Sequence, residues 1–432
     1  MKTFNVGLIG MGTVGTGVAS ILLEKNSPLV EKLNCVPVLK GIADSNPEVR
    51  KKLKLPSDVL FVNNAKELIG NPDIHVIVEL VGGIHPAKEI IMDALENGKD
   101  VITANKMLLA LHGSELFSKA QKHGKSISFE ASVGGGIPII AAVRDGFIAN
   151  RIESIFGIVN GTTNYILTKM TRENVKYCDA LSEAQKMGYA EKDPTMDVEG
   201  IDSSHKLAIL ARLGFGVDFD YKQIYCEGIN NVDLSDIWYA HELGYTLKLL
   251  AIAKRTENNN IELRVHPTLL THEHPLSSVN GVFNAICVNG NAVGETMLYG
   301  RGAGQMPTAS AVVADLVDVA LGRAGITFAA MKTFSRHCER VQIADILQVK
   351  TRYYLRFSVV DKPGVLAKIS GSLGDNEISI ASVIQHKVKG DGNVPLVIMT
   401  HVAEEGKLRK ALSEITKLDV VKDQTRLLRV EE

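Results

Sequence analysis

The chain has 432 residues, enough for about three domains of roughly 150 residues each, which excludes a single small core. Its 48 basic and 49 acidic residues nearly cancel, and no dense run of Lys and Arg indicates binding to nucleic acid or to a membrane surface. The partner that we expect is therefore a small molecule.

The cysteines and the N-terminal residues indicate the cellular compartment in which the protein is expected. The five cysteines are scattered, odd in number and without C-x-x-C spacing, which favours free thiols in a reducing compartment over disulfides or structural zinc. The N-terminus leads directly into a strand-like run without the basic and apolar regions of a signal peptide. No segment approaches about 18 uninterrupted apolar residues. We expect a cytoplasmic protein.

A strand over residues 3–10 and a helix to about Glu24 flank a glycine-rich turn. In the pattern G-x-G-x-x-G the first glycine allows the turn, the second lets a pyrophosphate approach, and the third lets the helix pack on the strand. The pattern alone is a weak signal, but a second strand over residues 36–43 ends at Asp44, where an acid would bind ribose hydroxyls. The expected cofactor-binding turn is Gly10, Met11, Gly12, Thr13, Val14 and Gly15.

Buried strands over residues 74–81, 100–103 and 126–129 alternate with helices near 86–97 and 106–123, which predicts a doubly wound parallel sheet. Ligands of such sheets lie at the carboxyl ends of the strands. Gly82, Thr103 and Lys106 come at these ends and should face the cofactor. Lys106 is either an active-site cation or an ordinary first-turn residue, and the helix dipole, which disfavours a cation there, favours the first interpretation.

A different pattern begins at Glu130, where a turn of three consecutive glycines precedes a helix to about Phe147. Such a turn lets backbone groups converge on a ligand. Long strands over residues 245–254, 261–270 and 281–288 predict a separate antiparallel sheet for substrate binding and oligomerisation.

An acid-dense segment from Glu191 to Lys206 runs into an apolar helix. Asp202 and Lys206 are four residues apart and so share one helix face. They form either an ordinary solvated ion pair, worth a few tenths of a kcal/mol, or a functional pair. The unbroken apolar run over residues 207–211 indicates a buried helix and favours the functional interpretation.

Three histidines, His266, His272 and His274, lie close together in the sequence. A metal site is conceivable, but the spacing of His272 and His274 is not one of the helical zinc spacings, so a structural role is preferred. The same holds for His205.

After about residue 350 the predicted order of elements is βαββαβ, typical of a ferredoxin-like unit of about 80 residues. We expect a dinucleotide-binding domain over 1–129 with return helices at about 305–345, a catalytic and dimerisation domain over 130–304, and a regulatory domain over 350–432.

Several of these motifs together closely resemble bacterial homoserine dehydrogenase. The resemblance rests on the turn of residues 10–15, Thr103-Ala-Asn-Lys106, Asn160-Gly-Thr-Thr-Asn-Tyr165, the segment from Asp193 to Lys206, and Tyr299-Gly-Arg-Gly-Ala-Gly304. The tail, with Asp361-Lys-Pro-Gly364, looks like the ACT domain often appended to that family. The resemblance implies reversible NAD(P)H-dependent reduction of L-aspartate 4-semialdehyde to L-homoserine, in the biosynthesis of threonine, methionine and isoleucine.

The resemblance also implies roles for single residues. The family's catalytic lysine falls on Lys206, with Asp202 beside it and Lys106 near cofactor and substrate, and either lysine is a candidate proton donor. The substrate-binding acid falls on Glu191, and we expect Asp193 and Asp197 of the same segment to assist it. The remaining expectations are the cofactor-proximal Gly302, a sodium or potassium site at Glu130, Val133, Gly135 and Ile137, and an effector site, with L-threonine expected, at Gly364, Val365, Leu366 and Asn376.

Two departures from the family pattern bear on these roles. Lys192 stands where many relatives have proline, which makes the placement of Glu191 less rigid. Ala43 stands where many relatives have arginine, and Asp44 without that arginine favours NAD, although NADP remains open. The alternatives are another Rossmann dehydrogenase of an amino-acid aldehyde or ketone and a non-catalytic amino-acid sensor. We expect a homodimer or homotetramer.

Overall fold

The computed structural model describes residues 2–24, 28–46, 55–332, 339–386 and 393–432. The chain divides into two compact units, and each unit is built from three segments. The strand β7 (Ile152–Ile158) and the helix α11 (Ile201–Phe215) pass along the chain from one unit into the other. The first unit comprises Met1–Ile155, His205–Lys222 and Phe283–Val341, and the second comprises Phe156–Ser204, Gln223–Val282 and Gln342–Glu432.

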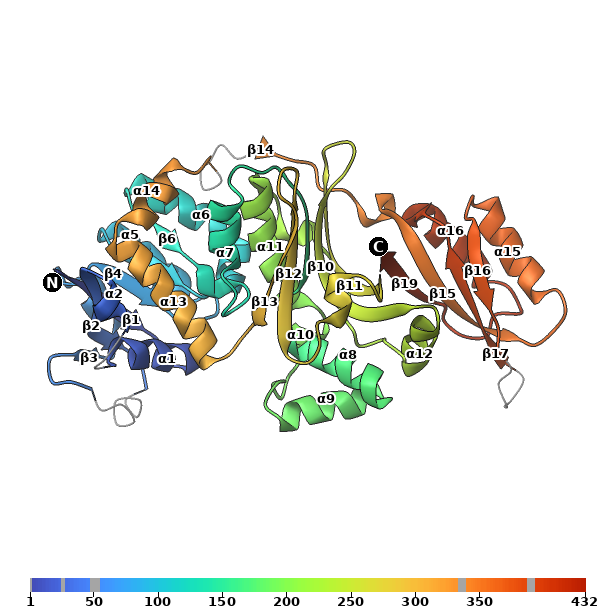
Figure 1. Cartoon of the computed structure of the whole chain (residues 1–432), viewed down its shortest axis with the longest axis horizontal. Helices are drawn as coiled ribbons and strands as arrows, with labels where there is room; N and C mark the ends of the chain where they lie inside the picture. Colours follow the sequence, from blue (N-terminus) through green and yellow to red (C-terminus); the bar gives the residue numbers. More distant parts are fainter. Residues whose placement is uncertain (1, 25–27, 47–54, 333–338, 387–392) are drawn as a thin grey trace. The chain divides into compact units, whose positions relative to one another are not determined.

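The first unit contains a six-stranded sheet in the order β3-β2-β1-β4-β5-β6, in which every neighbouring pair is parallel (Figure 1). This is the strand order of a doubly wound dinucleotide-binding sheet, so the expected fold class is confirmed. The strands are β1 (Lys2–Ile9), β2 (Cys35–Ala43), β3 (Leu60–Val62), β4 (Val76–Glu79), β5 (Asp100–Thr103) and β6 (Ile127–Ser128).

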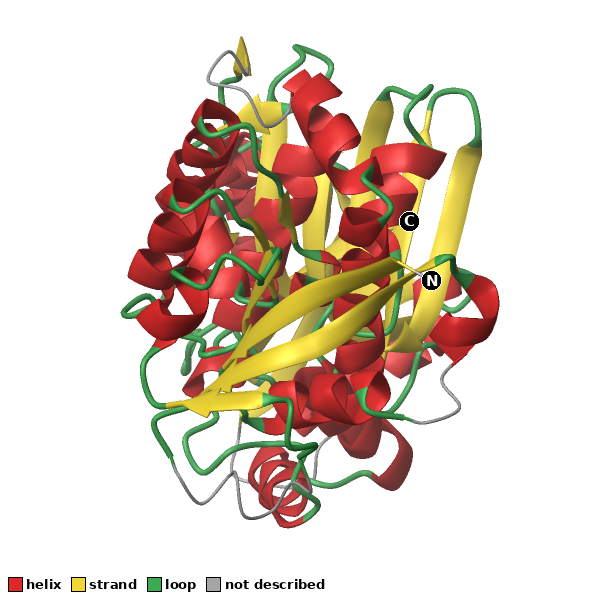
Figure 2. Cartoon of the chain, turned by 90° about the vertical axis from the view of Figure 1, so that its left-hand side faces the viewer, coloured by secondary structure: helices red, strands yellow, loops and turns green. Residues whose placement is uncertain are grey.

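Helices α1, α4, α5 and α13 pack on strands of this sheet, and helices and strands are distinguished by colour in Figure 2. On one side α1 (Thr13–Leu22) and α13 (Gln305–Ala320) pack on alternate strand residues such as Val6 and Leu8. The two helices approach closely, since a Cβ on Gly17 would lie 2.9 Å from the Cβ of Ala309. The other helices of this unit are α2 (Pro28–Lys32), α4 (Ala65–Ile69), α5 (Ala87–Glu96), α6 (Lys106–Lys122), α7 (Ile139–Ala141) and α14 (Arg323–Ala330).

The register aligns the carboxyl ends of the central strands. Ile9 at the end of β1 pairs with Ala43 of β2 and with Glu79 of β4, and Glu79 pairs with Thr103 of β5. The loops that follow these strands therefore begin along one edge of the sheet. A ligand is bound at this edge in doubly wound folds.

The first unit also contains an antiparallel hairpin of β12 (Phe283–Gly290) and β13 (Gly294–Arg301), and a short parallel pair of β8 (Val217–Asp218) and β14 (Glu339–Arg340). The helix expected after Pro138 is shorter than predicted. It is regular only over α7 and continues as a wider π-type turn over Ala142–Gly146. Among the described residues no helix is both long and apolar enough to cross a membrane.

The second unit pairs the long strands β10 (Tyr245–Arg255) and β11 (Ile261–Thr271) in an antiparallel ladder over their full length, as predicted. Short β9 (Tyr225–Cys226) pairs with the other edge of β11. The helices of this part are α8 (Gly161–Glu173), α9 (Tyr177–Lys186), α10 (Thr195–Val198) and α12 (Leu234–Glu242).

The C-terminal part of the second unit has the predicted βαββαβ order, with a short extra strand, β18. Its last strand begins at Arg426 rather than at Val420, because Lys422, Asp423 and Gln424 form an exposed polar turn before it. The elements are β15 (Lys350–Val360), α15 (Val365–Asp375), β16 (Ile380–Ile384), β17 (Asn393–Thr400), β18 (Ala403–Glu404), α16 (Glu405–Ile415) and β19 (Arg426–Glu431).

The last strand belongs to two ladders at once. β19 pairs antiparallel with β15 and parallel with β11, where Thr268 lies opposite Arg429 and Leu270 opposite Glu431. The sheet of the C-terminal domain is therefore continuous with the β10–β11 ladder. The sequence pattern predicted a self-contained C-terminal domain and gave no indication that β19 pairs with β11.

Candidate active site

The glycine-rich turn after β1 has the geometry that a bound dinucleotide requires. Gly10 has a positive φ of 93°, and a Cβ there would lie 2.7 Å from the backbone of Leu80. A Cβ on Gly15 would lie 2.0 Å from the carbonyl oxygen of Gly10, so helix and strand touch through backbone atoms. A Cβ on Gly12, by contrast, would have no atom within 4 Å. The open space beside Gly12 is where the motif lets a pyrophosphate approach.

Asp44 lies directly beside this turn. Its Oδ2 accepts a hydrogen bond of 2.6 Å from the backbone N–H of Met11, and its Oδ1 accepts one of 2.8 Å from Asn46. The carboxylate lines a cavity of about 600 Å³ together with Gly12 and Lys66. The residues present therefore fit the adenosine end of a nicotinamide cofactor, with an acid placed for ribose hydroxyls.

A buried acid fixes the loops that follow β4 and β5. Glu79 is fully buried, its Oε1 accepts from the backbone N–H groups of Val81 and Gly82, and its Oε2 accepts from the hydroxyl of Thr103 at 2.7 Å. Asn105 donates to the carbonyl of Gly83 and caps the helix that begins at Lys106. Sequence reasoning missed Glu79 and Asn105. The available signal was an acid inside an otherwise apolar strand.

The second glycine-rich turn packs against the segment after β13. A Cβ on Gly135 would lie 2.5 Å from the carbonyl oxygen of Gly302, and the N–H of Gly136 donates to the carbonyl of Arg301 at 3.0 Å. A Cβ on Gly302 would lie 1.9 Å from Nδ2 of Asn284. The amide of Asn284 is buried, and both of its polar atoms lack a hydrogen-bond partner among the described residues. Two expected site residues, Gly135 and Gly302, are thus neighbours.

Glu130 begins this turn and is buried. Its carboxylate accepts hydrogen bonds of 2.9 and 2.8 Å from the N–H groups of Ile140 and Ala141, and its own N–H donates to Asp315. Burial raises the pKa of Glu130. Within the described part of the chain no group of three or more His, Cys, Asp or Glu side chains is arranged to hold a metal ion. Any cation here would depend on backbone carbonyls.

In the second unit, Asn160 connects two of the expected acids. Its Nδ2 donates to Oδ1 of Asp197 at 2.7 Å and to Oδ2 of Asp202 at 2.8 Å, while its Oδ1 caps α8 by accepting from the N–H of Thr163. Sequence reasoning had quoted Asn160 within a motif without giving it a role. The structure brings Asp197 and Asp202 together through this amide.

Lys206 follows Asp202 by one helical turn on α11, so the two project from the same helix face. Both side chains are largely buried, at 7% and 5% exposure, which is rare for charged groups and excludes an ordinary solvated pair. Glu191 and Asp193 are exposed. The carboxylate of Asp193 accepts from the N–H and hydroxyl of Thr195, which lowers the pKa of Asp193 and holds the start of α10.

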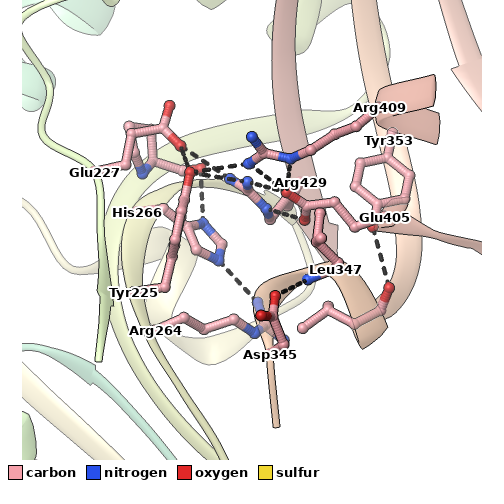
Figure 3. A network of polar contacts seen from close by, with 12 residues as sticks. Tyr225, Glu227, Arg264, His266, Asp345, Leu347, Tyr353, Glu405, Arg409 and Arg429 are labelled. Atoms are coloured by element: carbon pink, nitrogen blue, oxygen red, sulfur yellow. Dashed lines mark hydrogen bonds and ion pairs between the residues drawn. The ribbon is translucent and has the colours of Figure 1, made fainter. Parts of the chain in front are cut away.

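The histidines have structural contacts. His266 is fully buried, and its Nε2 lies 2.8 Å from Nη1 of Arg264 (Figure 3). Its Nδ1 lies 2.9 Å from the hydroxyl of Thr268. Burial lowers the pKa of His266 well below its ordinary value, so the ring is neutral and accepts from Arg264. His274 accepts from the N–H of Leu276, and these contacts support the structural role preferred from the sequence.

The expected effector residues are not gathered at one point. Gly364, Val365 and Leu366 lie at the N-terminal end of α15, whereas Asn376 follows its C-terminal end. Asn376 donates to the carbonyl of Ser372 and to Oε2 of Glu414. An 11-residue helix is about 16 Å long, so these residues do not form one site within a single copy of the chain.

Comparisons with known proteins decide the family. Residues 10–130 match the NAD-binding domain of homoserine dehydrogenase, residues 138–317 match homoserine dehydrogenase, and residues 353–420 match the ACT domain. The homoserine dehydrogenase of Neisseria gonorrhoeae is 43% identical over 100% of this chain and 99% of its own length. The chain belongs to the homoserine dehydrogenase family.

Further relatives agree with this assignment. The homoserine dehydrogenase of Bacillus subtilis is 42% identical over 100% of this chain and 99% of its own. A crystal structure of a homoserine dehydrogenase from Thiobacillus denitrificans superimposes with a TM-score of 0.94 at 42% identity, covering 100% of this chain and 99% of that one.

Membership confirms what the sequence predicted at the level of the enzyme class. The chain is an oxidoreductase that acts on a CH–OH group with a nicotinamide cofactor, and it carries a C-terminal ACT domain. As a member of the homoserine dehydrogenase family it takes part in amino-acid biosynthesis. The ACT domain supports regulation by a small molecule.

Proposed function

We propose that the chain catalyses the reversible NAD(P)H-dependent reduction of L-aspartate 4-semialdehyde to L-homoserine. The observation that carries this proposal is the burial of Lys206, which lies one helical turn after Asp202. Asn160 donates a hydrogen bond of 2.8 Å to the carboxylate of Asp202. A buried ammonium group stabilises an alkoxide-like oxygen and donates a proton to it.

The roles of the polar side chains follow from this chemistry. A nicotinamide cofactor held by the turn at Gly10 and by Asp44 would supply the hydride that the aldehyde carbon accepts. The ammonium group of Lys206, or that of Lys106 at the start of α6, protonates the oxygen, and Asp202 orients Lys206. We assign binding of the ammonium group of the substrate to Glu191 and Asp197, with Asp193 in the same segment.

For the cofactor we propose NAD rather than NADP. Asp44 is held by Met11 and Asn46 beside the adenosine cavity, where its charge repels a 2′-phosphate and its oxygens accept from a ribose diol. Lys66 lines the same cavity, so binding of NADP stays an alternative. The remaining residues that we assign to the cofactor are Gly10, Gly12, Thr13, Val14, Gly15, Gly82, Thr103 and Gly302.

We further propose a sodium or potassium ion near Glu130, Val133, Gly135 and Ile137. Oxygen ligands with a single carboxylate suit a hard, weakly charged ion. The chain would act as a homodimer or homotetramer in the synthesis of threonine, methionine and isoleucine. L-Threonine would be the effector, near Gly364, Val365 and Leu366.

Initial rates test the reaction. Purified protein should oxidise L-homoserine with NAD, and more slowly with NADP, while L-2-aminobutyrate, which lacks the hydroxyl, should give no turnover. The reverse reaction should consume NADH with L-aspartate 4-semialdehyde. Absence of turnover with both cofactors in both directions would contradict the proposal.

A further inference from the structure

One arginine of α11 reaches the helix that begins at Lys106. Arg212 lies in the second half of α11, within the first unit, and 13% of its side chain is exposed. Its Nη1 donates to the backbone carbonyl of Ala110 at 2.7 Å and to that of Leu109 at 3.2 Å, both in the first half of α6. Arg212 therefore links the helix of Lys206 to the helix of Lys106 through hydrogen bonds to the backbone.

The segment that follows α11 holds the same guanidinium from another side. Nη2 donates to the carbonyl of Phe219 at 3.0 Å, and Cζ lies 4.9 Å from the centroid of the Phe219 ring. Nε lies 3.5 Å from Oδ1 of Asp218, and the hydroxyl of Ser114 on α6 donates to that same oxygen at 2.9 Å. Because the donors of a guanidinium form a rigid planar fork, contacts on several sides fix its orientation.

Gly113 leaves room for this approach to α6. A helical side chain covers the turn that precedes it, so a side chain at position 113 would cover the carbonyl of Leu109. A Cβ on Gly113 would already lie 3.8 Å from Nη1 of Arg212, and a longer side chain would meet the guanidinium. Glycine inside a helix is destabilising relative to alanine. The helix thus has a small residue at the position where Arg212 must reach its backbone.

A charged side chain is not the most stable choice for this position. Burial lowers the pKa of Arg212, because desolvation penalises its charged form, and the nearby Asp218 and Asp220 oppose this effect. An apolar side chain of similar volume would fill the same place without the cost of desolvation. What the guanidinium adds is directional hydrogen bonding, which fixes the distance between the two helices as well as their contact.

This link lies close to both lysines along their helices. Leu109 follows Lys106 by three residues, which is about 4.5 Å along the axis of α6. Arg212 follows Lys206 by six residues, which is about 9 Å along the axis of α11. The ammonium group of a lysine ends a long flexible stem, so its position depends on where the helix holds the backbone. A displacement of about 1 Å can lower a rate by about 10²-fold.

We propose that Arg212 is a positioning residue of the reaction, since it holds the helix of Lys106 at a fixed distance from the helix of Lys206. It acts through these two lysines and not on the substrate itself. Without its hydrogen bonds α6 shifts relative to α11, and the two ammonium groups lose their relative position although both are still present. This inference rests on the proposed function, in which these lysines are the candidate proton donors.

Steady-state kinetics of the full-length protein test this role. Arg212→Leu removes all three hydrogen bonds of the guanidinium and keeps an apolar stem in its place. We expect kcat for L-homoserine to fall at least about tenfold, with the KM values for L-homoserine and NAD within about threefold of the wild type. The matched control Arg151→Leu removes an exposed arginine of the same unit, paired with Glu153, and should keep the wild-type kcat. A folded Arg212→Leu with the wild-type kcat would have only a structural role and would overturn the proposal.

A double-mutant cycle separates positioning of the lysines from a general loss of structure. Lys106→Ala alone should lower kcat. Adding Arg212→Leu to Lys106→Ala should then lower kcat by less than about threefold more, because the lysine that Arg212 positions is already absent. Losses that multiply independently would show that Arg212 does not act through Lys106 and would overturn the proposal.

Arg212→Lys provides the test if Arg212→Leu does not fold. It keeps the charge beside Asp218, but its nitrogen ends one atom short of the Nη positions, so kcat should still fall at least about threefold. A wild-type kcat in Arg212→Lys or in Lys106→Ala would overturn the role of Arg212 alone. Absence of L-homoserine turnover in the wild type would instead contradict the proposed function, so the two failures are distinguishable.

Discussion

Two cavities of this chain are built in different ways. In the first unit the cavity that we assign to the cofactor borders a turn shaped by backbone, where Gly10 and Gly15 allow contacts that no side chain would permit. In the second unit a cavity at the ACT domain is lined by side chains such as Arg429 and Glu227, which come from distant segments. A site made by a local turn leaves a motif in the sequence. A site made by scattered side chains does not.

Breaking the buried ion pair of the second cavity should have the largest effect. Arg429→Ala removes the buried partner of Glu405 and leaves this carboxylate only Arg409, and loss of one member of a buried pair costs up to about 3–5 kcal/mol. Denaturant unfolding should show this loss. Lys368→Ala, which removes an exposed pair with Asp419, should cost far less, because solvent screens that pair. Equal losses in the two variants would show that burial does not determine the stability of this junction.

The backbone-built cavity should be sensitive to a single methyl group. Gly15→Ala would place a Cβ 2.0 Å from the carbonyl of Gly10, and we expect a loss near the upper end of about 1–3 kcal/mol for overpacking. Gly12→Ala meets no atom within 4 Å, so it should unfold like the wild type but bind NADH more weakly. Denaturant unfolding measures the stability of the two variants, and titration with NADH measures the affinity of Gly12→Ala for the cofactor. Unchanged NADH binding in Gly12→Ala would argue against the proposed position of the pyrophosphate.

The positions of the Asp197 and Asp202 carboxylates should depend on the side-chain amide of Asn160. Asn160→Ala removes hydrogen bonds to Asp197 and Asp202, each worth about 1.5–3 kcal/mol because the acceptor is charged. We expect kcat/KM for L-homoserine to fall by roughly ten- to hundredfold. Asn97→Ala, at the exposed end of α5, serves as the control and should leave the rate unchanged. A normal rate in Asn160→Ala would remove this residue from the active site.

Replacement of His266 should have the smallest effect on stability, and this effect should depend on pH. Burial and the nearby Arg264 and Arg429 lower the pKa of His266, while Thr268 and the carbonyl of Pro267 face its Nδ1. The unfolded chain therefore binds a proton below about pH 6.5 that the folded chain does not. Stability should fall as the pH drops, by up to about 1.4 kcal/mol per pH unit. His266→Gln should reduce this slope between about pH 7 and pH 5, and an unchanged slope would assign the titration to other groups.

The sequence predicted what local patterns encode. The parallel sheet, the turn at Gly10 and the βαββαβ tail were expected from periodicity and spacing, and the structure contains them. The end of β2 at Asp44 was also predicted, because a run of apolar residues stops there. Roles for Glu191, Lys206 and the turn at Gly364 came from the resemblance to a family.

Other features depend on residues that are far apart in the chain. Asn160 meets Asp202 across 42 positions, and Arg429 meets Glu227 across 202. No spacing rule connects such pairs, because only the folded chain brings them together. The parallel pairing of β19 with β11 was missed for the same reason, since an alternating strand pattern does not specify which neighbour it pairs with.

The most direct test of the account is the rate of L-homoserine oxidation by Lys206→Ala, with NADH binding measured in the same preparation. Lys222→Ala, which removes an exposed lysine after α11, is the matched control. We predict a loss of about 10²- to 10⁴-fold in kcat for Lys206→Ala, as expected for removal of a general acid, with normal NADH binding and a normal control. A rate within about tenfold of the wild type would contradict the assignment of the chemistry to Lys206.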